Sequence, residues 1–253
     1  MMAKPYSEFN VFDYLILFGY IEIIFFVVIV SILFLRNRRD KPERLKNYLI
    51  GISIFLICFA VNWALIIYRD YFMDFTVMIL YPENYNEILV SDFYEITIFN
   101  TIWRIATAFV GFGLLVFIIV FELYILNKKT HFILSIIQAF FAIFSLFIGA
   151  RGGDEIVELK IFLYLGYFSG FVIPIIYFIL GARSTGSARR NSFGAGIGFL
   201  LLFFGIAFNS TVVQYVGTLV FNIPRATFEV IGSLISIGCI NAGIIIYKIS
   251  IKD

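Results

Sequence analysis

Ionisable side chains within long apolar stretches are the residues of this chain most suited to binding chemistry. Arg104, Glu22 and Glu229 each lie inside such a stretch. A charge within a bilayer is costly, so it normally faces the protein interior and finds a partner. We expect Arg104 to pair with Glu229, joined by Glu22. This cluster would line the floor of an outward-facing polar pocket for a small polar ligand. The alternative is a structural ion pair that fixes helix packing, with Arg225 screening Glu229.

Arg104 is also part of a polar stripe, whose members recur at intervals of three, four or seven residues and so share one helix face. The stripe comprises Asn100, Arg104, Thr107, Gly111, Ile118 and Glu122. At about 1.5 Å per residue, Arg104 lies roughly 10–12 Å into its span, and Glu122 lies near the inner surface beside Lys128 and Lys129. We therefore expect Glu122 to be an interfacial residue. Neutral hydrogen-bonding groups in the outer half are Asn62, Asn209 and Gln214.

The apolar stretches predict the elements that position these residues. The chain has 253 residues, of which 61% are hydrophobic, and about 20 apolar residues suffice to cross a bilayer. Backbone groups in lipid must bond internally, so each span is expected to be helical. The predicted spans are 11–35, 48–68, 96–126, 132–150, 161–182, 193–215 and 226–247. The predicted fold is all-α, a single seven-transmembrane helix bundle over residues 1–253. We expect no soluble output domain.

Lys and Arg in the connecting segments predict the orientation of the bundle. With the N-terminus outside, the inner segments hold most of these cations, and positive charge marks the cytoplasmic side. The inner set is Arg36, Arg38, Arg39, Lys41, Arg44, Lys46, Lys128, Lys129, Arg183, Arg189, Arg190, Lys248 and Lys252. We expect an integral protein of the plasma membrane, N-terminus outside and C-terminus inside. The basic face suits anionic lipid headgroups, and nucleic acid is a poor match.

Small residues at helical spacing indicate which helix faces meet. The sixth span has Gly194 and Gly198, and the seventh has Cys239 and Gly243. Such spacing lets helix backbones approach closely. Packing within one chain is the expected use of these residues, and a homodimer is the alternative.

Catalytic, metal and cofactor chemistry find little support. His131 is the only histidine, whereas a zinc site normally needs several His or Cys ligands. No hydrolase, metalloprotease or phosphate-binding motif is present. The middle of the seventh span, Ser236–Gly238, offers no lysine of the kind that holds retinal in microbial rhodopsins. We expect a protein that is not an enzyme and that holds neither metal nor cofactor.

The connection between the fifth and sixth spans carries a resemblance. Its sequence, Ala182-Arg183-Ser184-Thr185-Gly186-Ser187-Ala188-Arg189-Arg190, leads into the glycine-bearing sixth span. The segment and the N-out layout resemble the seven-helix sensor modules at the N-termini of prokaryotic histidine kinases. Those modules feed a cytoplasmic kinase domain, which we do not expect here. The resemblance therefore implies a prokaryotic sensor that signals through a separate cytoplasmic or membrane partner, docked at Arg183, Arg189 and Arg190.

These features favour a ligand-responsive membrane receptor or sensor. One alternative is a small-solute transporter that uses the buried charges for substrate or proton coupling. A third hypothesis is a structural or assembly subunit of a membrane complex. A transporter must open the polar stripe to both sides in turn, whereas a sensor needs no inner opening.

Overall fold

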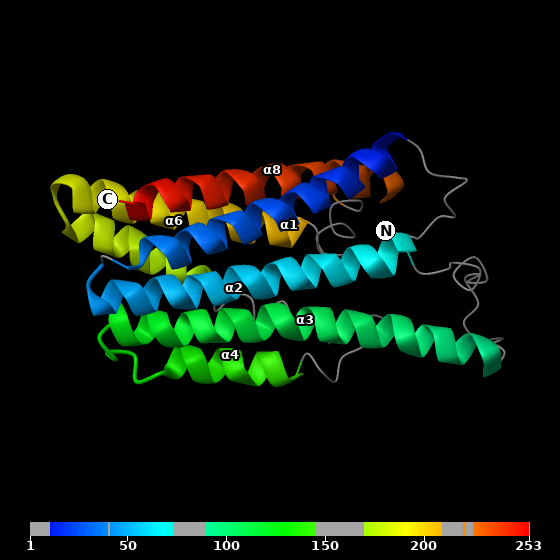
Figure 1. The fold of residues 1–253 in the computed structure, drawn as a ribbon, viewed down its shortest axis with the longest axis horizontal. Coiled ribbons are helices and arrows are strands. Elements are labelled where there is room, and N and C mark those ends of the chain that lie inside the picture. The colour runs from blue at the N-terminus through cyan, green and yellow to red at the C-terminus, as the bar shows by residue number, and fades with distance from the viewer. Residues whose placement is uncertain are drawn as a thin grey trace.

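Long helices that run alongside one another make up the described part of the chain (Figure 1). The computed structural model describes residues 11–39, 41–72, 90–144, 170–208, 220 and 225–252, without the side chains of residues 70, 90–100, 225, 226, 229 and 252. The helices are α1 (Val11–Asn37), α2 (Glu43–Ile67), the π-helical turn η2 (Tyr68–Phe72), α3 (Val90–Tyr124), α4 (Ile133–Phe144), the helix Gly170–Arg183, α6 (Gly186–Phe208) and α8 (Arg225–Lys252). No strand occurs within these ranges.

Five of these helices are long and apolar enough to cross a bilayer. Their membrane-compatible segments are Val11–Asn37, Glu43–Ile67, Thr101–Tyr124, Gly186–Phe208 and Val230–Ile251. The predicted helical membrane protein is confirmed at this level. Two shorter apolar helices, α4 and Gly170–Arg183, fall within the predicted fourth and fifth spans. The remainder of those two spans lies outside the described residues, so the count of seven stays a prediction.

Consecutive helices pack in antiparallel pairs. α3 lies between α2 and α4, and α2 lies between α1 and α3 (Figure 1). α8 packs against α6 on one side and against α1 on the other. α1 and α8 begin at the same end of the bundle and run in the same direction (Figure 1). We call α1 to α4 the N-terminal group of helices, and the helix Gly170–Arg183, α6 and α8 the C-terminal group. The contact between α1 and α8 joins these two groups.

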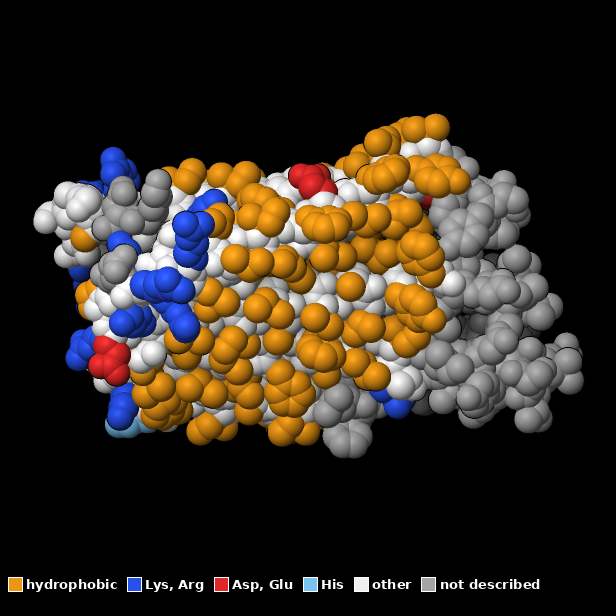
Figure 2. Space-filling model, in the orientation of Figure 1, with side chains coloured by type: hydrophobic (Ala, Val, Ile, Leu, Met, Phe, Trp, Pro, Cys, Tyr) orange, Lys and Arg blue, Asp and Glu red, His pale blue; other side chains and the backbone are white. Residues whose placement is uncertain are grey.

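Basic side chains gather at one end of the bundle, which we call the basic end. Figure 2 shows Lys and Arg at this end, next to a broad apolar surface. At this end α1 and α3 end, and α2 and α6 begin. The apolar surface matches a bilayer, because large exposed apolar side chains are otherwise unusual in such number. Which side of the membrane the basic end faces remains a prediction.

The helix before α6 and α6 itself are joined by a very short turn. Only residues 184 and 185 separate them, and Gly186 adopts a φ of 61°. Glycine tolerates this left-handed conformation, which strains other residues. The predicted sixth span began at Phe193, whereas α6 begins at Gly186. Apolar content marks where a helix enters the membrane, but it does not mark where the helix begins.

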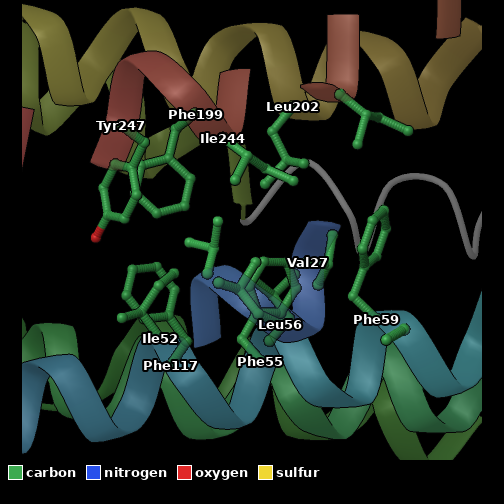
Figure 3. Packing of buried hydrophobic residues seen from close by; sticks show 14 of the residues in the cluster. Val27, Ile52, Phe55, Leu56, Phe59, Phe117, Phe199, Leu202, Ile244 and Tyr247 are labelled. Atoms are coloured by element: carbon green, nitrogen blue, oxygen red, sulfur yellow. The ribbon is translucent and has the colours of Figure 1, made fainter. Parts of the chain in front are cut away.

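An aromatic core joins the two groups of helices. Phe117 of α3 stacks on Phe199 of α6, with ring centroids 5.2 Å apart. Phe199 also contacts Tyr247 of α8, with centroids 4.5 Å apart. Figure 3 shows Phe199 and Tyr247 on one side of this contact, facing Ile52 and Phe117 on the other. All four side chains are buried, so the core is filled at this level of the bundle.

Candidate functional site

Between Gly111 and the basic end, the polar stripe of α3 packs against α4. Gln138 of α4 donates a hydrogen bond of 3.1 Å from Nε2 to the backbone oxygen of Gly111. A Cβ atom at Gly111 would lie 3.2 Å from the Cα of Ala142. Gly111 therefore allows the two helices to approach closely. At this level the stripe is covered by α4 and serves helix packing.

Glu122 completes this packing at the basic end. Its side chain is fully buried. Its carboxylate accepts hydrogen bonds from the backbone N–H groups of Leu134, at 3.2 Å, and Ser135, at 3.0 Å, in the first turn of α4. The hydroxyls of Thr130, at 2.6 Å, and Ser135 also donate to it. A carboxylate at a helix N-terminus satisfies free N–H groups and complements the helix dipole.

The prediction that Glu122 is an interfacial residue is therefore wrong, because its side chain is buried between α3 and α4. An interfacial carboxylate would project towards Lys128, Lys129 and solvent. The structure instead buries Glu122 beneath the turn that connects α3 to α4, where it caps the next helix. A cap supplied across a loop leaves no local sequence signature, because the usual capping residue immediately precedes the helix.

Arg104 lies in the other half of α3, away from the basic end. Asn47 of α2 bonds to Tyr124 at 2.8 Å, and a Cβ atom at Gly113 would contact Cys58. Extended along the antiparallel pair, this register places Arg104 level with Ile67. Its side chain is partly exposed, while its Nε is buried and has no hydrogen-bond partner among the described residues. Arg104 thus retains a donor for a group outside those residues.

The neighbours predicted for Arg104 have different outcomes. Thr107 is partly exposed, and Asn62 is buried on α2. Asn62 continues the side of α2 on which Phe55 and Cys58 meet α3, whereas Arg104 follows Gly111 on the side towards α4. The side chains of Asn100, Glu229, Asn209 and Gln214 lie outside the described residues. The pair of Arg104 with Glu229 therefore stays a prediction.

Glu22 occupies a different place from the predicted cluster. It is exposed on α1, and its Oε1 accepts a hydrogen bond of 3.4 Å from Nδ2 of Asn241 on α8. α2 lies between α1 and α3 (Figure 1). Glu22 and Arg104 are therefore on separate faces of the bundle. Asn241 was not singled out by the sequence, although an amide at the depth of Glu22 is the signal that could have identified it.

Three buried tyrosines form a hydroxyl cluster that the sequence did not reveal. The hydroxyl of Tyr48 on α2 lies 2.5 Å from that of Tyr177, and it also bonds to the hydroxyl of Tyr247 on α8. Phe121 and Phe199 pack on the Tyr177 ring. Tyrosines near span ends usually lie at the membrane interface. These three instead turn inwards and connect the two groups of helices.

The predicted docking residues lie together at the basic end. Arg183 ends one helix, and Arg189 and Arg190 occupy the first turns of α6. All three are exposed, and the Arg189 guanidinium lies 5.8 Å from the centre of the Phe193 ring. These three cations are therefore exposed at the ends of two helices that a short turn joins.

Neither a metal site among the described residues nor a known relative helps to assign this site. Within the described ranges, no group of three or more His, Cys, Asp or Glu residues could hold a metal ion. Comparisons with protein-family models, curated proteins and solved structures found no match to this chain. The resemblance to histidine-kinase sensor modules stays a prediction.

Proposed function

We propose that this chain is a ligand-responsive seven-helix receptor or sensor of the plasma membrane, N-terminus outside and C-terminus inside. Its ligand is a small polar molecule with an anionic group, bound in an outward-facing pocket beside Arg104. The signal passes to a separate partner that contacts Arg183, Arg189 and Arg190 at the basic end.

The observation that carries this proposal is the free donor of Arg104. Its Nε is buried and unpartnered among the described residues, and the side chain is partly exposed. A guanidinium offers five N–H donors in a planar fork, which match a carboxylate or phosphate. A buried donor without a partner is costly. An anionic ligand would remove that cost and so favour the liganded packing.

The packing between Arg104 and the basic end favours a sensor over a carrier. A carrier needs a polar path that opens to both sides. The stripe of α3 is covered by α4 at Gly111 and Glu122. The aromatic core around Phe117 and Phe199 fills the space between the two helix groups. Signal transfer requires only that this packing shift.

The mechanism is a change in population between two packings of the bundle. A ligand moves such an equilibrium only by its difference in affinity for the two states. The Tyr48 hydroxyl of the N-terminal group bonds to Tyr177 and Tyr247, which both belong to the C-terminal group. Closure around the ligand near Arg104 would change the relative position of these groups. The exposed start of α6 would then present its cations differently to the partner.

A ligand screen on matched variants tests the proposal. Purified wild-type protein, Arg104→Ala and Arg36→Ala would be heated with sets of small carboxylates, phosphates, amines and neutral sugars. We expect an anionic compound to raise the unfolding temperature of wild type and Arg36→Ala, but not of Arg104→Ala. Arg36 is an exposed arginine at the basic end and controls for loss of charge. Stabilisation that survives Arg104→Ala would contradict the proposed site.

A further inference from the structure

Glu22 lies in the middle of an otherwise apolar outer face of α1. Residues spaced by three or four along this helix are exposed on both sides of it, and Phe18 and Phe25 are each 66% exposed. The exposed members of this face are Val11, Leu15, Phe18, Glu22, Phe25, Ile29 and Ile32. Figure 2 shows acidic side-chain atoms within the apolar surface. Because α1 is a membrane-compatible helix, this face places a carboxyl group at mid-bilayer depth.

Asn241 is an insufficient partner for a carboxylate at this depth. Its amide donates one hydrogen bond of 3.4 Å, which is long for a charged acceptor. The Oδ1 of Asn241 is itself buried without a partner among the described residues. Among the described cations, Arg104 is on α3, beyond α2, and Arg36 is in the last turn of α1 at the basic end. Lys248 lies on the same side of α8 as Asn241, but about two turns, or roughly 10 Å, further towards the basic end. Glu22 therefore still requires a strong donor from outside the described residues.

The adjacent surface of α8 can admit another helix. Gly238 is exposed, and a Cβ atom built on it would have no neighbour within 4 Å. It lies one turn from Asn241 on the same side of α8. By contrast, the neighbouring Gly19 of α1 is closed by Ile237. Glycine on a lipid-facing surface lets a second helix approach closely, and the exposed Phe18 and Phe25 provide apolar contacts beside it.

We propose that the α1/α8 face around Glu22 and Gly238 is the docking surface for a transmembrane helix of another protein, one that carries a Lys or Arg at mid-bilayer depth. The ammonium or guanidinium donates to the Glu22 carboxylate beside Asn241. Gly238 receives the backbone of the partner helix. Ionisable residues within a membrane usually pair with one another or with backbone carbonyls.

Charge excludes a second copy of this chain as the expected occupant. A two-fold contact through this face would bring two Glu22 carboxylates together, because symmetric interfaces place the same residues on both sides. Among the described residues, the cation at comparable depth is Arg104, which belongs to another face. A basic helix from a different protein satisfies the carboxylate. This inference is independent of the ligand site at Arg104.

A synthetic transmembrane peptide provides the test. The full chain would be reconstituted in phosphatidylcholine nanodiscs with a fluorescent Leu/Ala-rich peptide that carries one central Lys, and association would be measured by energy transfer. Two control peptides carry a central Leu, or the Lys moved by two turns. We expect the central-Lys peptide to associate about tenfold more tightly than either control, as for an interaction of modest free energy.

Protein variants then locate the contact. Glu22→Gln should abolish the preference for the central Lys, while Glu43→Gln, at an exposed carboxylate of the basic end, should retain it. Gly238→Ile should weaken association with Glu22 intact, and this variant should fold because Gly238 is exposed and a Cβ atom there has no neighbour within 4 Å. Equal binding of Lys and Leu peptides would overturn the proposal. Self-association of the wild type that Glu22→Gln abolishes would overturn it in favour of a second copy.

Discussion

Buried polar groups of this protein act mainly by connecting helices. Glu122 joins α3 to the start of α4, and Tyr48 joins α2 to Tyr177 and Tyr247. In lipid, water cannot replace a lost hydrogen bond, so a single substitution exposes the contribution of each group. Arg104 differs from them, because its buried Nε lacks a partner among the described residues. Arg104 therefore differs from Glu122 and Tyr48, although Trp63 Nε1, Ser236 Oγ and Asn241 Oδ1 are also buried without a partner among the described residues.

Replacement of Glu122 should loosen the start of α4. Glu122→Ala removes a carboxylate that accepts two backbone and two hydroxyl hydrogen bonds. We expect the free energy of unfolding to fall by roughly 2–4 kcal/mol, as charged hydrogen bonds and a helix cap are lost together. The free energy of unfolding of Glu122→Gln should lie between those of Glu122→Ala and wild type, since an amide keeps one acceptor oxygen. Unfolding in mixed micelles measures the change, and a loss no larger than that of Glu43→Ala would refute the cap.

Tyr48 should be the most sensitive member of the hydroxyl cluster. Tyr48→Phe keeps the ring but removes the hydroxyl that bonds to both Tyr177 and Tyr247. We expect a loss of about 1–3 kcal/mol, because two buried hydroxyls each lose a hydrogen-bond partner. Tyr177→Phe and Tyr247→Phe each remove one of these contacts and should cost less. Equal losses for all three variants would show that Tyr48 is not the common partner.

Close helix contacts depend on glycine at the crossing of α6 and α8. A Cβ atom on Gly243 would lie 2.6 Å from the backbone oxygen of Gly198 and 2.8 Å from the backbone nitrogen of Leu202. A Cβ atom on Gly205 would lie 2.9 Å from the backbone oxygen of Ser236. The backbones thus touch along the two helices, and backbone atoms cannot move aside as a side chain can. The predicted use of Gly198 and Gly243 for packing within one chain is confirmed, whereas Gly205 was not singled out by the sequence.

Two glycines of α8, Gly243 in contact with α6 and Gly238 in open space, allow a controlled comparison of the same substitution. Gly243→Ala should destabilise the protein by about 1–3 kcal/mol, because the new methyl group overlaps the α6 backbone. Gly238→Ala should leave stability unchanged or raise it by up to about 1 kcal/mol, because nothing lies within 4 Å of the new atom and alanine favours a helix. Both changes can be measured by thermal unfolding in one detergent. Similar effects at the two positions would contradict the observed packing of α8.

Several elements could be predicted from the sequence because lipid sets their length and polarity. α1, α2 and α6 coincide with predicted spans, although α6 begins before its apolar stretch. The partners of polar residues could not be predicted in the same way. Glu22 and Arg104 both read as interior charges, yet α2 lies between the helices that carry them. Hydropathy gives the depth of a residue, whereas its partner depends on how each helix is rotated and on its neighbours.

The distribution of charge over the whole molecule predicts its orientation in the membrane. In a background with Cys58→Ser and Cys239→Ser, we expect Ser187→Cys at the basic end to react with an impermeant maleimide only after the cells are permeabilised. Phe72→Cys, exposed at the other end of the bundle, should react in intact cells. The reason is that Lys and Arg of membrane proteins concentrate in the segments on the cytoplasmic side. The reverse pattern would place the basic end outside.

The central claim is that a ligand near Arg104 changes the basic end, and a distance between spin labels tests it most directly. Labels on Lys129→Cys and Ser187→Cys, in the same cysteine-free background and in nanodiscs, would report the separation of the α3–α4 turn and the start of α6. With the stabilising anion we expect the main distance to shift on the order of 2 Å or more, and Arg104→Ala should abolish the shift. An anion that binds at Arg104 but leaves this distance unchanged would contradict a sensor.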